Sequence, residues 1–453
     1  MNKSTTCKKI AVLIAIVMLM TQMSCRKEAD FIVSPLGTSP GNYNQGNNNT
    51  DIVQKWYALA LQLVKETPGH CPAVTARSFG YMGITLYQSV LPGQSGTQHS
   101  LVGQLNGLTA LPAKQQGEQY AESITVNAAM AKIIKSLFGN ATVSNGSRID
   151  SLQAAIELAN SVNLPPAVVT VSANYGRSVA DAVFAWSMTD GGHQAYLNNF
   201  PTTYVAPVGP GLWVSTSPAF PLPMLPYWGS NRTFVAADAA GPIDPPAPPV
   251  YSTSTSSEFY TEAMIVYNTV NNLTPAQKEI ATYWADGGSS ITPPGHNIAI
   301  VLQIIRNKNV NLLQAATLLA KTGIGLNDAA IVCWRSKFKI NLLRPVSYIR
   351  DNISPLWSTF IPTPPFPSYT SGHASFSGVT ASLLTDKFGD HFSFTDSTKM
   401  AYGFAPRQFN SFDEVAEEAA ISRLYGGIHY RFDNVNGVTC GRLIGANVAA
   451  LNW

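Results

Sequence analysis

The chain has 453 residues, of which 45% are apolar and only 12% are charged. This composition supplies a large core and excludes a mostly disordered chain. The formal charge of +3 comes from three lysines in the first 24 residues, and the rest of the chain has 26 basic and 26 acidic side chains. A neutral balance gives no sign of nucleic acid or an acidic polymer as partner.

Residues 1–24 predict an export signal of the lipoprotein type. A basic start leads into an apolar run from Ile10 to Met20, which is too short to span a bilayer. The run is followed by Ser24-Cys25, which resembles the end of a bacterial lipoprotein signal with Cys25 as the lipidated residue. Ordinary secretion is the alternative. We expect an exported protein, periplasmic or attached to the outer membrane through the lipid alone.

Residues 25–50 are rich in Asn, Gly, Pro and Ser, which predicts a flexible tether. Helical periodicity begins at residue 51, with Asp51 as the expected N-cap. Further helical patterns cover residues 117–138, 147–162 and 176–190. The next segment, 201–252, is rich in proline and aromatic residues, and we expect it to form a long ordered loop over the helices.

Helical patterns resume at residue 274, where Thr274 is expected to cap a helix and Pro275 to occupy its first turn. They continue over residues 296–308, 310–339, 372–389, 413–430 and 436–452. Alternation typical of strands is scarce. The chain from 51 to 453 is therefore predicted to be one all-α domain, a helical bundle, with its chemical motifs between residues 330 and 435.

The cysteines show no spacing typical of a metal site, so zinc is not expected. Once Cys7 is removed and Cys25 is lipidated, Cys71, Cys333 and Cys440 remain. Buried unreactive thiols are the favoured interpretation, and a single disulfide is left open. Five histidines also lack ligand spacing, and one of them, His296, is expected to begin a helix: His70, His99, His193, His296 and His391.

Three cations lie in apolar surroundings near the C-terminus: Lys337 and Arg344 in "KFKINLLRP", and Arg423 in "SRLYGGIH". Buried cations need a partner, and a tetrahedral oxyanion would neutralise all three. In "PSYTSGH", Ser371 adds a hydroxyl donor. Gly372 lets a backbone N–H at a helix start come close to the anion. The pattern predicts a phosphate-like site.

Two histidines adjoin this predicted cradle. His373 follows Gly372 directly and could give or take a proton. His429 could bond the central atom of the anion through one ring nitrogen, and Asp433, four residues later, could accept a hydrogen bond from the other. Each motif alone is also compatible with an ordinary turn or a surface histidine. Their joint occurrence in one order favours a single site.

The stretches "KFKINLLRP", "PSYTSGH" and "SRLYGGIH" resemble the three signature motifs of the vanadium-dependent haloperoxidase and type 2 phosphatidic acid phosphatase superfamily, over about residues 270–453. The resemblance implies a helical bundle with the oxyanion site at its core. It implies that the anion oxygens are held by Lys337, Arg344, Ser371, Gly372 and Arg423.

The same resemblance implies roles for the remaining motif residues. His429 would be the vanadate ligand, or the phosphorylated nucleophile of a phosphatase. His373 would be the acid–base group, and Asp433 would orient His429, as in the phosphatase branch. Asp286 in "WADGG" would support Arg423, although its spacing from the preceding tryptophan departs from the chloroperoxidase pattern.

Two aromatic residues favour the oxidase branch. Trp334 and Phe366 are similar in placement to the residues that wall the halide side in chloroperoxidase-type members, and core packing is the alternative interpretation. The expected activity is oxidation of halide by hydrogen peroxide with vanadate as cofactor. The alternative is a metal-independent acid phosphatase that binds phosphate in place of vanadate and cleaves a phosphate ester through a phosphohistidine. The intact motifs argue against a binding protein without turnover. The halide, the organic acceptor and the oligomeric state stay open.

Overall fold

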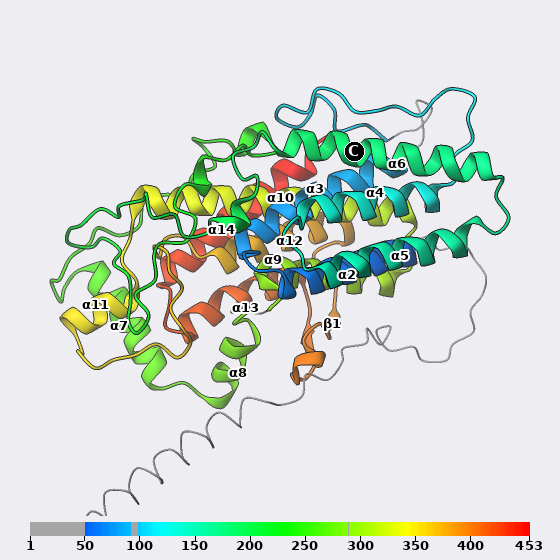
Figure 1. Cartoon of the computed structure of the whole chain (residues 1–453). Helices are drawn as coiled ribbons and strands as arrows, with labels where there is room; N and C mark the ends of the chain where they lie inside the picture. The colour runs from blue at the N-terminus through cyan, green and yellow to red at the C-terminus, as the bar shows by residue number, and fades with distance from the viewer. Residues whose placement is uncertain (1–49, 92–97, 289) are drawn as a thin grey trace, which may run out of the picture. The chain divides into compact units, whose positions relative to one another are not determined.

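The computed structural model describes residues 50–91, 98–288 and 290–453 (Figure 1). The expected signal, Cys25 and all of the expected tether except Thr50 lie outside these residues. The described residues belong to one compact unit. It is built from helices, with one short antiparallel ribbon of β1 (Phe394–Asp396) and β2 (Arg407–Phe409). The predicted all-α class is confirmed.

The N-terminal half of the described chain consists of α2 (Thr50–Glu66), α3 (Pro72–Val90), α4 (Glu122–Leu137), α5 (Val143–Ser161) and α6 (Pro166–Ser187). Helix α2 begins at Thr50, so the prediction that Asp51 precedes the helix as its cap was wrong. Asp51 instead lies in the first turn, where its negative charge is favourable, and pairs with Lys55 at 2.6 Å. None of the described helices is both long and apolar enough to cross a membrane.

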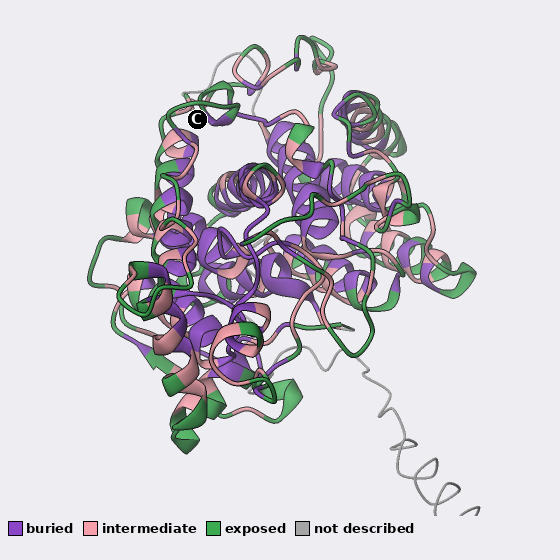
Figure 2. Cartoon of the chain, turned by 90° about the vertical axis from the view of Figure 1, so that its left-hand side faces the viewer, coloured by how far each residue is buried: buried purple, intermediate pink, exposed green. Residues whose placement is uncertain are grey.

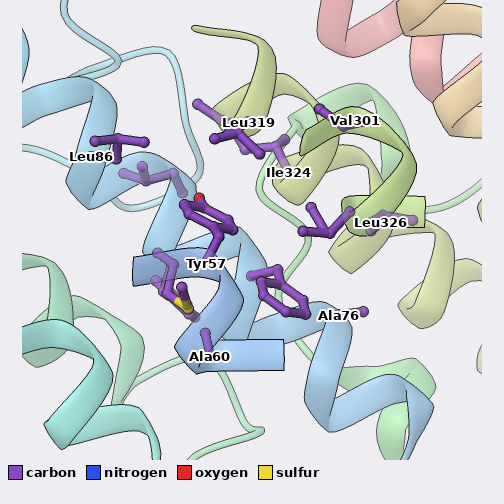
Figure 3. Close-up of a cluster of buried hydrophobic side chains, with 14 of the residues drawn as sticks. Tyr57, Ala60, Ala76, Leu86, Val301, Leu319, Ile324 and Leu326 are labelled. Carbon is purple, nitrogen blue, oxygen red and sulfur yellow. The ribbon is translucent and has the colours of Figure 1, made fainter. Parts of the chain in front are cut away.

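Helix α3 was not expected from the sequence, yet it lies at the centre of the core. Every residue from Ala73 to Val90 is buried, so the helix has no polar face and no visible period. It packs backbone to backbone on α10 (Leu312–Ile340): a Cβ added to Gly323 would lie 2.4 Å from the carbonyl oxygen of Phe79. Figure 3 shows the side chains that meet there from α2, α3, α9 and α10.

The C-terminal half comprises α7 (Glu258–Asn271), α8 (Pro275–Tyr283), α9 (Thr292–Lys308), α10, α11 (Pro345–Asn352), α12 (Gly372–Phe388), α13 (Phe412–Tyr425) and α14 (Arg431–Ala449). Thr274 caps α8 in a capping box and Pro275 opens it, as predicted. Helix α9 begins at Thr292, so His296 lies one turn inside the helix and does not begin it as predicted. The sequence patterns did not predict α7 or α11. Buried residues concentrate on the inner helices, whereas loops and outer faces are exposed (Figure 2).

The Pro-rich segment is ordered, as predicted, with short 3₁₀ turns η2 (Trp228–Ser230) and η3 (Ala236–Asp238). Two further turns of this kind, η1 (Ala195–Leu197) and η4 (Met400–Tyr402), lie outside it. The buried carboxylate of Asp328 on α10 accepts hydrogen bonds from the N–H groups of Phe234 (2.8 Å) and Val235 (2.9 Å). These bonds hold the segment against α10.

The three described cysteines are unpaired: Cys71 is half-buried, and Cys333 and Cys440 are buried. Burial raises the pKa of Cys71 to about 11 and that of Cys440 to about 12. Both thiols are therefore protonated at neutral pH, in agreement with their interpretation as unreactive.

Candidate active site

Five neighbouring parts of the C-terminal half contain the motif residues. Lys337 lies in the last turn of α10, Arg344 caps α11, Arg423 ends α13, and Asp433 lies in the first turn of α14. The other members are Ser371, Gly372 and His373 at the start of α12, and His429 just before α14. Six of these eight side chains are almost fully buried, and Gly372 and His373 are half-buried. The structure thus brings every predicted motif residue into one region.

Lys337 is bound by the loop before α12. Its Nζ donates hydrogen bonds to the carbonyl oxygens of Pro367 (2.9 Å), Ser368 (2.9 Å) and Thr370 (2.6 Å). An ammonium group has three N–H donors, so the loop uses all of them. Lys337 can therefore act on an anion through its charge but not through a hydrogen bond. Burial lowers the pKa of Lys337 to about 7.

Arg344 connects two segments of the site and keeps one donor free. Its Nε donates to the carbonyl oxygen of Phe366 (2.8 Å), and its Nη1 donates to that of Ile428 (2.7 Å). The same Nη1 lies 3.1 Å from Nε2 of His429. Among the described residues, Nη2 of Arg344 has no hydrogen-bond partner although it is buried. Burial lowers the pKa of Arg344 to about 9, which leaves the guanidinium charged at neutral pH.

His429 is held in one tautomer. Its Nδ1 donates to Oδ2 of Asp433 at 2.8 Å, the contact that the i, i+4 spacing predicts. The same oxygen accepts from Oγ of Ser368 (2.5 Å) and from the N–H of Tyr430 (3.2 Å). Burial, followed by the charge of Arg344, holds the pKa of His429 well below its usual range. The ring is therefore neutral, with the lone pair on Nε2.

The start of α12 presents unused polar groups. Oγ of Ser371 and Nε2 of His373 are buried without a hydrogen-bond partner in the described chain. A Cβ added to Gly372 would meet no atom nearer than 3.6 Å, so its backbone N–H, at the first position of the helix, is approachable. Burial and then the charge of Arg423 hold the pKa of His373 well below its usual range. The neutral imidazole can accept a proton, and a bound anion near Arg423 would raise its basicity by offsetting that charge.

Arg423 has few partners for a buried cation. Its Nε donates to Oγ of Ser422 (3.1 Å), and its Nη2 reaches the carbonyl oxygen of Ala281 at 3.4 Å. Burial lowers its pKa to about 10, and the charge of Asp286 opposes that effect. The carboxylate of Asp286, however, is hydrogen-bonded to His296 and Lys399, and no hydrogen bond joins it to Arg423. The expected support of Arg423 by Asp286 is therefore electrostatic.

A cavity of about 650 Å³ adjoins these groups. Four of the eight motif residues line it: Gly372, His373, Arg423 and His429. The turn between α2 and α3 and the Pro-rich residues 361–366 form other parts of its wall. The remaining predicted members, Lys337, Arg344, Ser371 and Asp433, are not among its lining residues and lie behind that surface.

Trp334 and Phe366 both line the cavity, with ring centroids 5.1 Å apart. Phe366 also covers two cations: its centroid lies 4.9 Å from Nζ of Lys337 and 5.0 Å from Cζ of Arg344. Contacts of this kind stabilise a cation away from water. The indole N–H of Trp334 donates to the carbonyl oxygen of Met224 at 3.2 Å, which fixes the wall to the Pro-rich segment.

The charges and unpaired atoms of the site fit an oxyanion. Two buried guanidinium cations, Arg344 and Arg423, and the partly protonated Lys337 face one carboxylate, Asp433, that is hydrogen-bonded within the site. Burial raises the pKa of Asp433 to about 6, so it is ionised at neutral pH and offsets one of these charges. An anion with several oxygens would balance the rest and would give partners to the unpaired polar atoms.

Sequence reasoning missed two side chains that organise the site. Ser368, which bonds Asp433, lies within the motif "PSYTSGH", but the motif does not show which of its hydroxyl groups reaches Asp433. Lys399, which pairs with Asp286, lies 113 residues beyond it in a polar loop. Each contact exists only once distant segments are folded together.

Comparison with known proteins shows the family. The sequence is 25% identical to the vanadium chloroperoxidase of Curvularia inaequalis over 487 aligned positions, which cover 85% of this chain and 79% of that protein. This chain is 33% identical in sequence to the protein in the crystal structure of the first bacterial vanadium-dependent iodoperoxidase. The two structures match with a TM-score of 0.80 over 88% of this chain and 95% of that one. The chain belongs to the vanadium haloperoxidase family.

Two further comparisons agree with this membership. Residues 317–452 match the family model described as the VCPO second helical-bundle domain, which is the part that contains the motifs. A holo-type bacterial vanadium-dependent chloroperoxidase shares the fold, with a TM-score of 0.59 and 16% identity over 83% of this chain and 91% of that one. The similarity extends well beyond the expected residues 270–453 into the N-terminal helices. The chain is thus an oxidoreductase of the vanadium haloperoxidase type, as predicted.

Proposed function

We propose that this chain is an exported enzyme that holds vanadate and oxidises a halide with hydrogen peroxide. The observation that supports the proposal is the state of His429. The ring is neutral, and Asp433 fixes it in the tautomer that has its lone pair on Nε2. The buried cations around the ring outnumber the carboxylates hydrogen-bonded to it. A site of this kind offers one bond to a central atom and positive charge to the surrounding oxygens.

The residues divide the binding of vanadate among them. Hydrogen-bond donors remain on Arg344, Ser371 and the N–H of Gly372, and Arg423 adds charge from the side of α13. Lys337 contributes charge from behind the loop. When bound, vanadate would supply the electrophilic centre that activates hydrogen peroxide toward halide.

His373 is proposed to accept and return a proton. The overall reaction joins halide, hydrogen peroxide and one proton to give hypohalous acid and water, so the halide loses two electrons and the peroxide gains them. The neutral ring of His373 has an unpaired Nε2, and it lines the cavity. Trp334 and Phe366 would provide a poorly hydrated surface for the halide. Iodide is the first halide to test, because the structure with 33% identity is an iodoperoxidase.

One contact also favours a second function, an acid phosphatase. The hydrogen bond to Asp433 orients the ring of His429, as a histidine nucleophile requires. Phosphate resembles vanadate in shape and charge. In this alternative His429 would attack a phosphate ester, and His373 would protonate the leaving oxygen.

One paired assay separates the two functions. Protein with one equivalent of vanadate is given peroxide with iodide, bromide or chloride, and the same preparation without vanadate is given p-nitrophenyl phosphate. We expect vanadate-dependent halide oxidation that added phosphate inhibits. Ester cleavage without any halide oxidation between about pH 5 and pH 8 would contradict the oxidase and favour the phosphatase.

We also propose that the protein is exported and anchored by lipid at Cys25. The basic start, the short apolar run and Ser24-Cys25 support this proposal. In cells, Cys25→Ala should move the protein from the membrane fraction to the soluble fraction. Equal fractionation of the variant and the wild type would refute the anchor.

A further inference from the structure

The loop after α8 brings a carboxylate to the wall of the cavity. Asp286 lines the cavity together with His373 and Arg423, and its side chain is fully buried. Its backbone has φ of 41°, a left-handed conformation that is uncommon outside glycine, although aspartate adopts it more readily than most residues. Hydrogen bonds from His296 and Lys399 fix the carboxylate in this place.

His296 lies behind Asp286, one turn into α9. Its Nδ1 is 2.9 Å from Oδ2 of Asp286, and its Nε2 is 3.6 Å from Oδ2 of Asp396 at the end of β1. The ring stacks on Trp284 with centroids 4.5 Å apart. The side chains of His296 and of both carboxylates are fully buried. Two buried carboxylates beside a histidine favour the protonated form of its ring.

Other charged and polar groups around the pair complete the balance. Lys399 donates to Oδ1 of Asp286, and Tyr283 on α8 donates to Oδ2 of Asp396 at 2.6 Å. The titratable and charged groups that face His296 or its two carboxylates are Tyr283, Asp286, His373, Asp396, Lys399, Tyr402 and Arg423. With His296 protonated, His296 and Lys399 balance the charges of Asp286 and Asp396, and Arg423 keeps its own. With His296 neutral, one negative charge is left over.

That leftover charge would act on the active site. The charge of Asp286 acts on both Arg423 and His373. The backbone of Trp284, on which His296 stacks, hydrogen-bonds the ring of His373. Burial alone would lower the pKa of His296, but Asp286 and Asp396 outweigh burial and hold the pKa above its ordinary value. This balance agrees with a charged His296 at neutral pH.

We propose that His296 is a positioning residue of the active site: its protonated ring matches the charge of Asp286 and so leaves the charge of Arg423 for the bound anion. The inference rests on the proposed anion site. When His296 loses its proton, the negative charge of Asp286 offsets the positive charge of Arg423. The affinity of the site for an oxyanion then falls.

The first measurement is the protonation state of His296. The chain has seven histidines, and spectra of protein with ¹³C-labelled histidine, compared with those of His296→Asn, identify the signal of His296. We expect the ring of His296 to stay protonated at neutral pH and to titrate above the ordinary range of histidine. A neutral His296 at about pH 7 would overturn the proposal. This test uses the wild type alone, apart from the assignment.

The second measurement is affinity for sulfate, a tetrahedral anion whose charge is constant above about pH 4. At pH values below the titration of His296, the His296→Asn variant should bind sulfate about fivefold more weakly than the wild type. At pH values above that titration, the two proteins should bind sulfate with equal affinity. A merely structural role would weaken binding equally at every pH, which would contradict the proposal. His391→Asn is the matched control and should bind sulfate as the wild type does.

The outcomes also separate this inference from the proposed function. If the wild type binds no sulfate, phosphate or vanadate, the anion site itself is wrong. If it binds them and the ratio between His296→Asn and wild type does not depend on pH, only the role of His296 is wrong. Should His296→Asn fail to fold, Lys399→Gln tests the same balance, because loss of that cation should raise the titration point of His296.

Discussion

Nδ1 of His429 and Oδ2 of Asp433 lie 2.8 Å apart, and both side chains are buried at the start of α14. The carboxylate also accepts from Ser368, in the loop that leads to α12. Asp433 therefore fixes the tautomer of His429 and connects two of the three motifs. It acts on the anion through His429, as second-layer carboxylates do at metal sites.

Substitution of His429 should reduce vanadate binding more than substitution of Asp433. His429→Ala removes the proposed bond to the central atom and should abolish measurable vanadate binding. Asp433→Asn keeps the shape but loses the charge that selects the tautomer, and should weaken vanadate binding about tenfold to a hundredfold. Titration calorimetry measures both. Unchanged vanadate binding in His429→Ala would show that the site is assigned wrongly.

Phe366 permits a test of the apolar wall. Phe366→Asn should lower halide oxidation about tenfold or more, equivalent to about 1.4 kcal/mol of barrier, because a polar side chain hydrates the halide surface. Since the ring also covers Lys337 and Arg344, vanadate affinity has to be measured beside the rate. Phe366→Leu is the matched control: it removes the ring but stays apolar, and should lose less than about threefold in rate. Equal losses in the two variants would mean that the ring face matters and the polarity of the wall does not.

The low pKa of Lys337 predicts proton uptake on anion binding. The unfolded chain keeps this lysine charged to about pH 10, whereas burial lowers the pKa in the folded chain to about 7. Between these values the folded protein binds fewer protons, so this group's contribution to stability rises with pH. A nearby oxyanion raises the pKa again. Near pH 8, binding of an oxyanion should therefore be accompanied by uptake of up to about one proton per site. Calorimetry in buffers of different ionisation enthalpy detects this uptake.

The control for this experiment is Lys339→Met. The side chain of Lys339 is 71% exposed, two residues from Lys337 on α10. Its removal should leave the proton uptake unchanged, whereas Lys337→Met should reduce it. Proton release, or uptake that persists in Lys337→Met, would assign the titration to another group.

The contact between α3 and α10 predicts a stability difference between two glycines. Gly323→Ala would force a Cβ to within 2.4 Å of the carbonyl oxygen of Phe79, and should cost about 2 kcal/mol or more of unfolding free energy. Gly146→Ala on α5 meets no atom within 4 Å, and should be neutral or stabilising by up to about 1 kcal/mol. Urea unfolding compares them. Equal stability would mean that the two helices separate at little cost.

The sequence predicted the parts of the protein that have a local signature. Helix α8 has a Thr-Pro start, and the contact between His429 and Asp433 follows from helical spacing. Helix α3 lacks such a signature because all of its faces are buried, so apolar and small residues occur without a period. Its start at Pro72 follows a cysteine, which is not a common cap.

The site could be predicted as a set of residues but not as a geometry. The motifs identified Lys337 as a group for an anion, yet the loop carbonyls that bind it follow from the path of the chain between residues 367 and 370. Asp286 was placed near Arg423, but its hydrogen bonds go to other partners. Backbone acceptors and ion pairs between distant segments leave no pattern in one sequence.

The ammonium of Lys337 occupies its loop much as a potassium ion occupies a ring of carbonyl oxygens in an ionophore. Truncation of this side chain would leave three oxygen dipoles directed at one vacant point. Such a ring is selective for monovalent cations of suitable size. The defect of Lys337→Ala should therefore depend on whether the buffer contains ammonium, potassium or only sodium, and not on ionic strength alone.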